Sequence, residues 1–444
     1  MHETSPPFGL NVIGYASANL GLGNTLRQYV KCFIARGDKV RVLDIDAGMD
    51  RSGFDRSLEA WTVPSTLDLP YAVNLLVFSA TELPRLALSP LEGLNVNNRL
   101  NTAFVWWELT TLPQHWIDAA KLFDVLIAGS DFLYSVLSEN IPGIPILRAP
   151  HPLQIPEHIQ PNRERFGLPE KGLIVFSGFD PHSNVERKNP FAAITAFKLA
   201  FANNSDCHLA IKVNNPTGGE NLGQADLDRL RTLIESDSRI HLIQESLPYH
   251  DLLSLYASCD VFVSLHRAEG LGLVPLEAMR LGKPVVATAW SGNMSYMNYR
   301  NACLVEFGFV PVGAGSPVYS HEALGIKGHW AEPNVHQAAA WLRKLAEDPL
   351  FRFQIGSKAA ADANRYHEQA CRSDFVDELK SIWESRDFLP KRDREALIHQ
   401  ARESKRDFEY EKSLNKMGEF ERLKHKAKKK IDRHLLWRFR SAKT

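Results

Sequence analysis

The feature that most constrains the fold is an alternation of short apolar runs with amphipathic segments, which occurs twice along the chain. In the first series the apolar runs read LNVIGY, KVRVLDI, AVNLLVF, TAFVWW and DVLIAG. In the second they include GLIVFSG, CHLAIKV, RIHLIQE, DVFVSLH and KPVVAT, with helical patterns such as NPFAAITAFKLAF between them. Buried strands that alternate with helices form parallel sheets covered on both faces. The sequence therefore predicts an α/β fold with two doubly wound domains.

A proline-rich stretch separates the two series. Prolines occur at positions 142, 145, 150, 152, 156, 161 and 169, where they disfavour a continuous helix or a central strand. The 444 residues also exceed the length that a single hydrophobic core usually serves. We expect a first domain at 1–155, a linker at 156–170 and a second domain at 171–360. Closing helices are expected at 361–390, with a crossing back to the first domain as one option. A basic amphipathic helical tail is expected at 391–444.

Composition is that of a soluble globular protein, with 44% hydrophobic and 23% charged residues. No uninterrupted apolar run approaches the roughly 18 to 20 residues of a membrane-spanning helix. The first residues, MHETSPPFGLNVIGY, lack the basic and apolar segments of a secretory signal, so we expect a cytoplasmic location. The five cysteines have no metal-like spacing and are expected to be core residues with free thiols: Cys32, Cys207, Cys259, Cys303 and Cys371.

Loops that follow strands are the candidate sites, because open parallel sheets bind ligands beyond the carboxyl ends of their strands. The first such loop is GYASANLGLGN, which runs from Gly14 to Asn24. Gly21 and Gly23 allow close approach of the backbone, and a helix beginning there would direct free N–H groups at a phosphate. The spacing is not GxGxxG, which weakens a dinucleotide-cofactor interpretation. A tight turn with no ligand is the alternative.

The richest candidate site is the segment RAEGLGLVPLEAMRLGKPVVAT, which follows the strand-like DVFVSLH. Glu269 lies in the loop, and Glu277 lies about one turn inside a helix expected at residues 273–280. Gly270 and Gly272 would leave N–H groups free to meet oxygens of a phosphate or sugar. One carboxylate can accept hydrogen bonds from sugar hydroxyls and the other from a ribose diol. Two surface glutamates at a helix entry are the alternative.

Two adjacent cations, Arg187 and Lys188, lie in the third candidate loop, FSGFDPHSNVERKNP. A leaving nucleoside diphosphate develops negative charge, which fixed cations at a strand end would stabilise in the transition state. A solvated pair of surface cations is the alternative.

Together these segments resemble glycosyltransferase family 4, also called glycosyl transferases group 1. Its members have the GT-B fold of two facing Rossmann-like domains and transfer sugar from a nucleotide-activated donor with retention of configuration. The similarity covers most of residues 9–385 and is strongest in SLHRAEGLGLVPLEAMRLGKPVVATAWSGN. The resemblance implies that Glu269 contacts the donor sugar and Glu277 the nucleotide ribose. It also assigns Arg187 and Lys188 to the diphosphate.

The resemblance implies a catalytic set and a donor-binding set of residues, and it implies no cofactor and no bound metal. The catalytic set is Glu269, Arg187 and Lys188. The donor-binding set is Gly21, Leu22, Gly23, Gly178, Gly270, Leu271, Gly272, Leu273 and Glu277.

The first domain departs from the family pattern after its mid-domain strand. Where many members carry a histidine, this chain reads TAFVWWELTTLP, with Trp106, Trp107 and Glu108, and resembles a subset from bacterial surface polysaccharide synthesis. Glu108 is a candidate for binding acceptor or donor hydroxyls and Trp107 for stacking on a sugar face. A core position is the alternative for both. Asn293, in the variant loop SGNMSYM, is a further candidate for sugar binding.

These residues predict a retaining, metal-independent hexosyltransferase that uses a nucleotide-sugar donor and a glycan or lipid-linked saccharide acceptor. We expect the donor on the second domain, the acceptor on the first, and closure about the linker. A sugar-nucleotide epimerase of GT-B type and a glycogen phosphorylase-like enzyme would use the same architecture. A non-catalytic sugar-nucleotide binding protein is the alternative from another class.

The end of the chain is strongly basic. Residues 412–444 contain 12 Lys or Arg and 3 Asp or Glu, a net +9 in a chain whose total is zero. An amphipathic series runs from Leu414 to Leu435, and basic amphipathic helices favour anionic membrane surfaces. We expect peripheral attachment there, with a solvated helix or a partner-binding coil as the alternative. No nucleic-acid motif accompanies the basic residues, so no nucleic-acid partner is expected.

Overall fold

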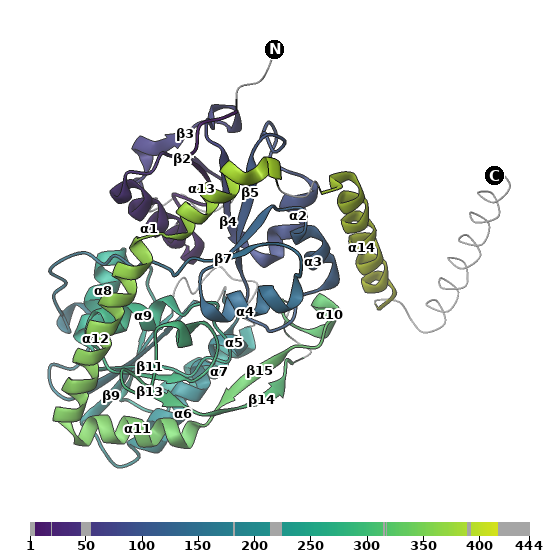
Figure 1. The fold of residues 1–444 in the computed structure, drawn as a ribbon. Coiled ribbons are helices and arrows are strands. Elements are labelled where there is room, and N and C mark those ends of the chain that lie inside the picture. The colour runs from purple at the N-terminus through teal and green to yellow at the C-terminus, as the bar shows by residue number, and fades with distance from the viewer. Residues whose placement is uncertain are drawn as a thin grey trace, which may run out of the picture.

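The computed structural model describes residues 5–18, 20–45, 55–180, 183–213, 224–313, 316, 318–388 and 392–415. They form two α/β domains, each built on a parallel sheet, with the helical C-terminal region along both (Figure 1). The predicted fold class is therefore confirmed.

The first sheet has seven parallel strands in the order β3-β2-β1-β4-β5-β6-β7. Its order reverses between β1 and β4, which is where open sheets of this kind bind ligands. The short strand β7 lies inside the proline-rich stretch, and its place at the edge of the sheet tolerates the flanking prolines. The strands are β1 (Leu10–Gly14), β2 (Val40–Asp44), β3 (Thr62–Val63), β4 (Val73–Ser79), β5 (Leu100–Trp106), β6 (Val125–Ala128) and β7 (Ile146–Arg148), and the helices are α1 (Gly21–Arg36), α2 (Leu83–Leu88), α3 (Gln114–Ala120) and α4 (Asp131–Asn140).

The second sheet has six parallel strands in the order β10-β9-β8-β11-β12-β13. Its interior strands are almost wholly buried, as expected of a sheet covered on both faces. The strands are β8 (Leu173–Phe179), β9 (Cys207–Val213), β10 (Ile240–Ile243), β11 (Val261–Ser264), β12 (Val285–Thr288) and β13 (Cys303–Val305), and the helices are α5 (Val185–Lys188), α6 (Pro190–Ala200), α7 (Gln224–Glu235), α8 (Tyr249–Ser258), α9 (Leu273–Arg280) and α11 (Val335–Glu347).

An antiparallel hairpin, which the sequence did not predict, leaves the second domain and reaches the first. It consists of β14 (Phe307–Pro311) and β15 (His329–Pro333), with α10 (His321–Leu324) between them (Figure 1). Trp330 and Tyr319 from this segment lie in the hydrophobic cluster of the first domain, beside Trp107. We call the described residues of 307–333 the arm, because they join the two domains on one side.

Helices α12 (Pro349–Cys371) and α13 (Phe375–Ser385) join the domains on the other side, and α13 packs against the first sheet (Figure 1). The expected boundary at residue 360 falls inside α12.

Cys371, at the end of α12, forms a disulfide with Cys32 in α1, with their Cα atoms 5.1 Å apart. The expectation of free thiols is therefore wrong for this pair, whose 339-residue separation hides their proximity. Cys207, Cys259 and Cys303 are buried and free.

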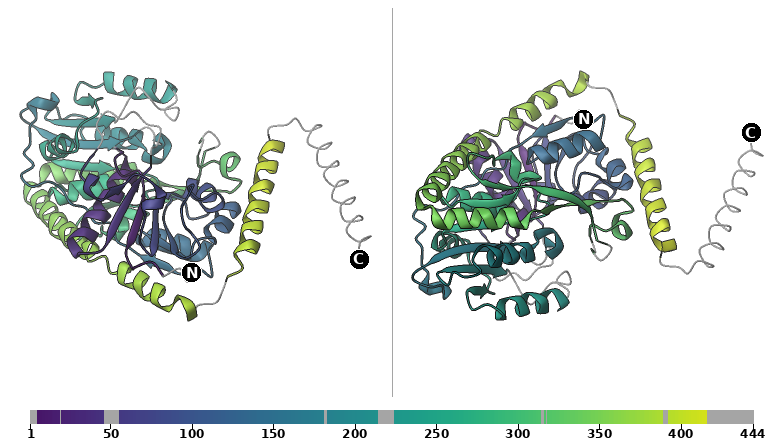
Figure 2. Two further views of the ribbon diagram at one scale, coloured as in Figure 1. Left: turned by 90° about the horizontal axis from the view of Figure 1, so that it is seen from above. Right: turned by 90° about the horizontal axis from the view of Figure 1, so that it is seen from below.

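The last described helix, α14 (Arg394–Asn415), lies against the first domain (Figure 2). Its Phe408 ring stacks on His115 of α3 with centroids 4.0 Å apart, and Gln400 donates a hydrogen bond to Asp118. Ala401 and Leu414 are buried. Residues 394–415 of the tail expected at 391–444 are helical and pack on the first domain. The amphipathic series beyond Leu414 lies outside the described residues. Within the described part of the chain, no helix has the length and apolar character needed to cross a membrane.

Phe375 should be a principal anchor of α13 on the first domain. It is 2% exposed and contacts the rings of Tyr29, Phe33 and Phe104. We expect Phe375→Ala to lower the free energy of unfolding by about 3–5 kcal/mol, because it removes apolar contacts and leaves a cavity. Phe353→Ala, a change of the same size in α12 at a side chain 72% exposed, is the control and should cost less than about 0.5 kcal/mol. Equal losses in urea titrations would contradict the packing assigned to Phe375.

Candidate active site

Three loops meet at the carboxyl ends of β8, β11 and β12. The first contains the short helix α5, which begins after Asn184, a residue with a left-handed φ of 71°. The side chain of Asn184 accepts a hydrogen bond from the backbone N–H of Arg187 at 2.9 Å and so fixes the helix start. The backbone N–H of Arg267 donates to the Arg187 carbonyl at 2.8 Å, which ties this loop to the one after β11.

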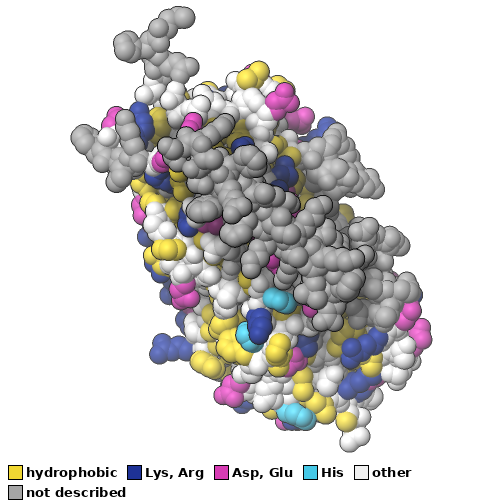
Figure 3. All heavy atoms as spheres, turned by 90° about the vertical axis from the view of Figure 1, so that its right-hand side faces the viewer, with side chains coloured by type: hydrophobic (Ala, Val, Ile, Leu, Met, Phe, Trp, Pro, Cys, Tyr) yellow, Lys and Arg dark blue, Asp and Glu magenta, His cyan; other side chains and the backbone are white. Residues whose placement is uncertain are grey.

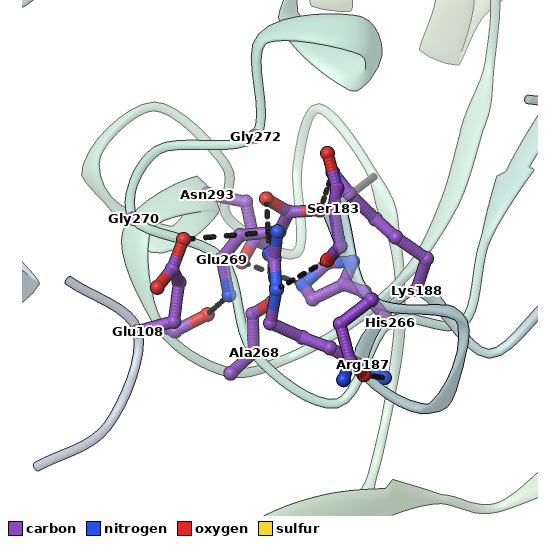
Figure 4. A network of polar contacts seen from close by, with 12 residues as sticks. Glu108, Ser183, Arg187, Lys188, His266, Ala268, Glu269, Gly270, Gly272 and Asn293 are labelled. Atoms are coloured by element: carbon purple, nitrogen blue, oxygen red, sulfur yellow. Dashed lines mark hydrogen bonds and ion pairs between the residues drawn. The ribbon is translucent and has the colours of Figure 1, made fainter. Parts of the chain in front are cut away.

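Glu269 is the centre of the site (Figure 4). Its Oε1 lies 2.6 Å from Nζ of Lys188, and its Oε2 lies 3.0 Å from Nη1 of Arg187. Burial alone would raise the pKa of this carboxyl, but Lys188 and Arg187 lower it to about 2. Glu269 is therefore ionised at neutral pH although only 7% of its surface is exposed. The sequence predicted that these three residues would act together, and the structure brings them into contact.

Arg187 is held on every side by protein acceptors. Its Nε donates to the Ser183 carbonyl at 3.1 Å, and its Nη1 donates to the Ala268 carbonyl at 2.9 Å as well as to Glu269. Its Nη2 lies 3.7 Å from Oε1 of Glu108, which follows β5 in the first domain. With 4% of its surface exposed, Arg187 orients Glu269, whereas Lys188, whose side chain is 18% exposed, is the more accessible cation.

Glu108 connects the site to the arm. Tyr319 donates a hydrogen bond from its hydroxyl to Oε2 of Glu108 at 2.9 Å, and the ion pair with Arg187 uses the other oxygen. The Glu108 side chain is 20% exposed, so it can still meet a ligand. The sequence did not identify Tyr319, because its segment shows no motif and approaches the site only through the fold.

Trp107 takes the core position that the sequence left open. It is 1% exposed, its indole N–H donates to the Thr111 carbonyl at 2.9 Å, and its ring packs on Trp116 and Tyr319. It therefore supports the strand end behind Glu108 and presents no face to a sugar.

The loop after β11 is fixed by close backbone contacts. Gly272 precedes α9 with a left-handed φ of 84°, and no side chain caps this helix start. A Cβ atom at Gly292 would overlap the backbone of Gly270, so only glycine fits there. Across the cleft, Ser130 of the first domain donates a hydrogen bond to the Gly270 carbonyl at 2.6 Å. Because no side chain caps the start of α9, its first N–H groups are available to an anionic ligand.

Asn293 and His266 form a buried pair behind Glu269 (Figure 4). His266 Nε2 lies 3.1 Å from Oδ1 of Asn293, whose Nδ2 donates to the Thr288 carbonyl at 3.0 Å. Both side chains are 0% exposed, and burial lowers the pKa of His266. Asn293 therefore positions the loop from within. The sequence missed His266, although its place three residues before Glu269 in SLHRAE was an available signal.

Glu277 lies one turn inside α9, where only 4% of its surface is exposed. Its Oε1 accepts a hydrogen bond from the Tyr249 hydroxyl at 3.0 Å. Burial raises the pKa of Glu277 to about 8, and this hydrogen bond lowers it only in part. At neutral pH, Glu269 is thus negatively charged, whereas Glu277 is mostly protonated and neutral.

The remaining donor-binding candidates occupy supporting positions. Gly23 lies inside the first turn of α1, where a Cβ atom would overlap the carbonyls of Tyr15 and Ala18. Arg27 donates to the carbonyls of Ala16 and Ala18 at 2.8 and 3.0 Å and so shapes this loop. The other candidates lie at the start of α1, within β8 and around the start of α9: Gly21, Leu22, Gly178, Leu271 and Leu273.

Comparison with known proteins supports this architecture. Residues 160–307 match the family model Glycosyl transferases group 1. Similar solved structures include the Anabaena protein HepE in complex with UDP and glucose, with a TM-score of 0.60 and 17% identity over 84% of this chain and 100% of that one. Sucrose-phosphate synthase from Thermosynechococcus elongatus is similar with a TM-score of 0.59 and 14% identity over 85% and 100%. The chain has the GT-B fold.

Curated relatives are similar over part of the chain. The serotype-specific mannosyltransferase WbdA of Escherichia coli is 37% identical over 131 residues, which is 28% of this chain and 14% of the relative. A second WbdA sequence is 36% identical over 134 residues. The matched part of this chain therefore spans about one seventh of the length of these relatives.

The raised pKa of Glu277 makes stability depend on pH. Between about pH 4.5 and about pH 8, the folded protein keeps a proton on Glu277 that the unfolded chain has released. This proton contributes to the free energy of unfolding. The contribution is complete below about pH 4.5 and is lost as the pH rises through about 8. We expect the free energy of unfolding of the wild type to fall relative to that of Glu277→Gln between about pH 4.5 and about pH 8. Glu322→Gln, at an exposed residue of α10, is the control. Parallel pH profiles for wild type and Glu277→Gln would contradict the burial effect.

Proposed function

We propose that the protein is a retaining glycosyltransferase of family 4 that moves a hexose from a nucleotide-sugar donor to a saccharide acceptor in bacterial surface polysaccharide synthesis. The observation that carries the proposal is the buried pairing of Glu269 with Lys188 and Arg187, within the segment similar to glycosyl transferases group 1. The similarity to a mannosyltransferase supports a hexose donor, and the solved relative with UDP and glucose supports a nucleoside diphosphate leaving group.

The donor would bind to the second domain. The diphosphate would lie near Lys188 and the uncapped start of α9, where a cation and free N–H groups meet it. Glu269 keeps lone pairs beyond those used by its two cations, so its ionised carboxylate can accept hydrogen bonds from donor-sugar hydroxyls. Arg187 would act as a positioning residue that holds Glu269.

Transfer would proceed on one face of the donor sugar. As the bond to the leaving diphosphate breaks, negative charge grows on its oxygens, and Lys188 together with the N–H groups stabilises that charge. The leaving phosphate oxygen would take the proton of the attacking acceptor hydroxyl. Glu108, which comes from the first domain and is partly exposed, would bind an acceptor hydroxyl.

The proposal includes no metal ion. Among the described residues, no three His, Cys, Asp or Glu side chains are grouped so that they could hold one. In this proposal Lys188 supplies the positive charge that a metal provides in other transferases. Activity that survives exhaustive chelation would support this part of the proposal, and loss restored by added magnesium would overturn it.

The role of Lys188 can be tested with Lys188→Ala. We expect a loss of roughly 100-fold in kcat/KM, because one fixed cation at the leaving group is removed. Donors for the assay are the UDP and GDP conjugates of glucose and mannose, with release of nucleoside diphosphate measured in the presence of oligosaccharide acceptors. Lys171→Ala, at an exposed residue before β8, is the control and should retain full activity.

The same assay separates the competing functions. An epimerase would convert the nucleotide sugar without an acceptor, and a non-catalytic binding protein would bind it without release of diphosphate. Unchanged turnover and donor affinity in Lys188→Ala would overturn the site assignment.

We also propose that the basic end of the chain attaches the enzyme to the cytoplasmic face of an anionic membrane, where a lipid-linked acceptor would be found. Residues 416–444 contain 11 Lys or Arg and 3 Asp or Glu. On the face of the protein seen in Figure 3, described Lys and Arg side chains lie scattered among Asp and Glu side chains. The basic end therefore supplies the concentration of charge that such attachment requires.

Liposome flotation tests this attachment. The full chain should float with vesicles that contain phosphatidylglycerol and stay unbound to neutral ones, because the attraction is electrostatic. The matched variant removes residues 416–444 and keeps α14, which packs on the first domain. Equal recovery of both proteins with anionic vesicles would contradict attachment through this segment.

A further inference from the structure

The last carbonyl groups of helix α5 depend on a residue outside the helix. With only four residues, α5 gains little stability from its own hydrogen bonds. The carbonyl of Glu186 would ordinarily accept from the N–H of the residue four positions later, but Pro190 has no N–H. Instead, Nη1 of Arg267 donates to this carbonyl at 2.8 Å, and the backbone N–H of Arg267 donates to the Arg187 carbonyl at 2.8 Å. Arg267 therefore completes the carboxyl end of α5.

The arm holds Arg267 in this position. Nε of Arg267 donates to Oε2 of Glu332 in β15 at 2.5 Å, and the Arg267 carbonyl accepts from the backbone N–H of Ala331 at 3.1 Å. The side chains of Arg267 and Glu332 are 21% and 37% exposed, so salt screens this ion pair less than a fully exposed one. One planar guanidinium thus contacts an acceptor on the arm and an acceptor on α5 at once, which the single nitrogen of a lysine cannot reproduce.

The arm also contacts the first half of α5 directly. Nδ2 of Asn184, the N-cap residue, donates to Oγ of Ser316 at 3.1 Å. Oε1 of Glu186 accepts from the backbone N–H of Gly313 at 3.3 Å. The arm therefore binds α5 near its start through these two contacts and at its end through Arg267.

We propose that Arg267 is a positioning residue: by tying the end of α5 to the arm, it holds Lys188 where the diphosphate leaves. The inference rests on the proposed function, because it assigns Lys188 to a leaving group. Lys188 is the last residue of α5, and its Nζ lies 2.6 Å from Oε1 of Glu269 (Figure 4). A shift of the helix end would move this ammonium relative to the phosphate, and a misplacement of about 1 Å can cost roughly 100-fold in rate.

The first test is Arg267→Ala in the assay of nucleoside diphosphate release, with the UDP and GDP conjugates of glucose and mannose and oligosaccharide acceptors. We expect kcat to fall roughly tenfold with the KM for the donor nearly unchanged, because the displaced cation acts on charge that develops in the transition state. Arg267→Lys should lose about as much. Lys327→Ala removes an exposed cation from the same arm and is the matched control, which should keep the wild-type kcat.

Glu332→Gln tests the contribution of the arm without removing the guanidinium. The variant keeps the bond from Arg267 to the Glu186 carbonyl and replaces a charge-assisted hydrogen bond by a weaker neutral one, so kcat should fall by roughly twofold to fivefold. If Arg267→Ala lacks a cooperative thermal transition, Glu332→Gln decides the question in a folded chain. An unchanged kcat in Glu332→Gln would overturn the role of the arm.

The second test is a cycle with Lys188→Ala. If Arg267 acts through Lys188, Arg267→Ala or Glu332→Gln should lower kcat in the chain that has Lys188 and have little further effect in Lys188→Ala. Losses of equal size in the two backgrounds would show that Arg267 acts on the reaction by another route and would overturn the inference.

The outcomes separate this inference from the proposed function. If Lys188→Ala loses activity and Arg267→Ala does not, the inference is overturned and the transferase proposal stands. If the donor KM rises in Arg267→Ala as much as kcat falls, the change disturbs the whole donor site, and the assignment to Lys188 is overturned. If folded wild type releases no diphosphate from any of the donors, or if Lys188→Ala is as active as wild type, the site assignment fails and this inference fails with it.

Discussion

The ionised carboxylate of Glu269 can remain buried only because Lys188 and Arg187 contact it, and the geometry of the cleft depends on that pairing. An unpaired carboxylate with 7% exposure would take up a proton, since removing its charge from water costs several kcal/mol. The pairing forces the loop after β8 to lie against the loop after β11. It also leaves Arg187 fully engaged, so its contact with Glu108 extends the same network to the first domain.

Contacts on both sides of the cleft restrict the closure that the sequence predicted. On one side α13 packs on the first sheet, and on the other the arm places Trp330 in the core of the first domain. Between them, Ser130 donates a hydrogen bond across the cleft to Gly270. A rigid opening of the whole cleft would break all three contacts at once. Rearrangements of single side chains break fewer contacts and are cheaper ways to admit a ligand.

Much of the fold and the centre of the site could be predicted because their signals are local. Apolar runs of strand length identified most of the parallel strands, and the segment around Glu269 carries its glycines and glutamates within a few residues. The sequence placed Lys188 and Glu269 in loops after two strands of one sheet, and these loops meet because β8 and β11 are neighbours. The direct ion pair between the two side chains was not predicted.

Features that depend on distant parts of the chain could not be predicted in this way. Tyr319 contacts Glu108 across 211 positions of sequence, and its segment contains no motif that indicated a site. The Cys32–Cys371 bond depends on how α12 crosses to α1. Trp107 could not be assigned for a different reason. An aromatic residue beside a candidate carboxylate at a strand end can face either the core or the ligand site, and the sequence does not determine which.

The two glutamates of the cleft show why residue identity alone does not determine a role. Glu269 and Glu277 are both buried, and burial raises the pKa of each. Cations overcome that effect at Glu269, whereas the described residues offer Glu277 a hydrogen bond from the Tyr249 hydroxyl, and its pKa stays at about 8. Carboxyl groups whose environments separate their pKa values in this way are suited to different tasks. For the proposed transferase, a fixed negative charge at Glu269 suits a position beside the donor sugar, and a neutral carboxyl at Glu277 can accept hydrogen bonds from a ribose without adding negative charge near the diphosphate.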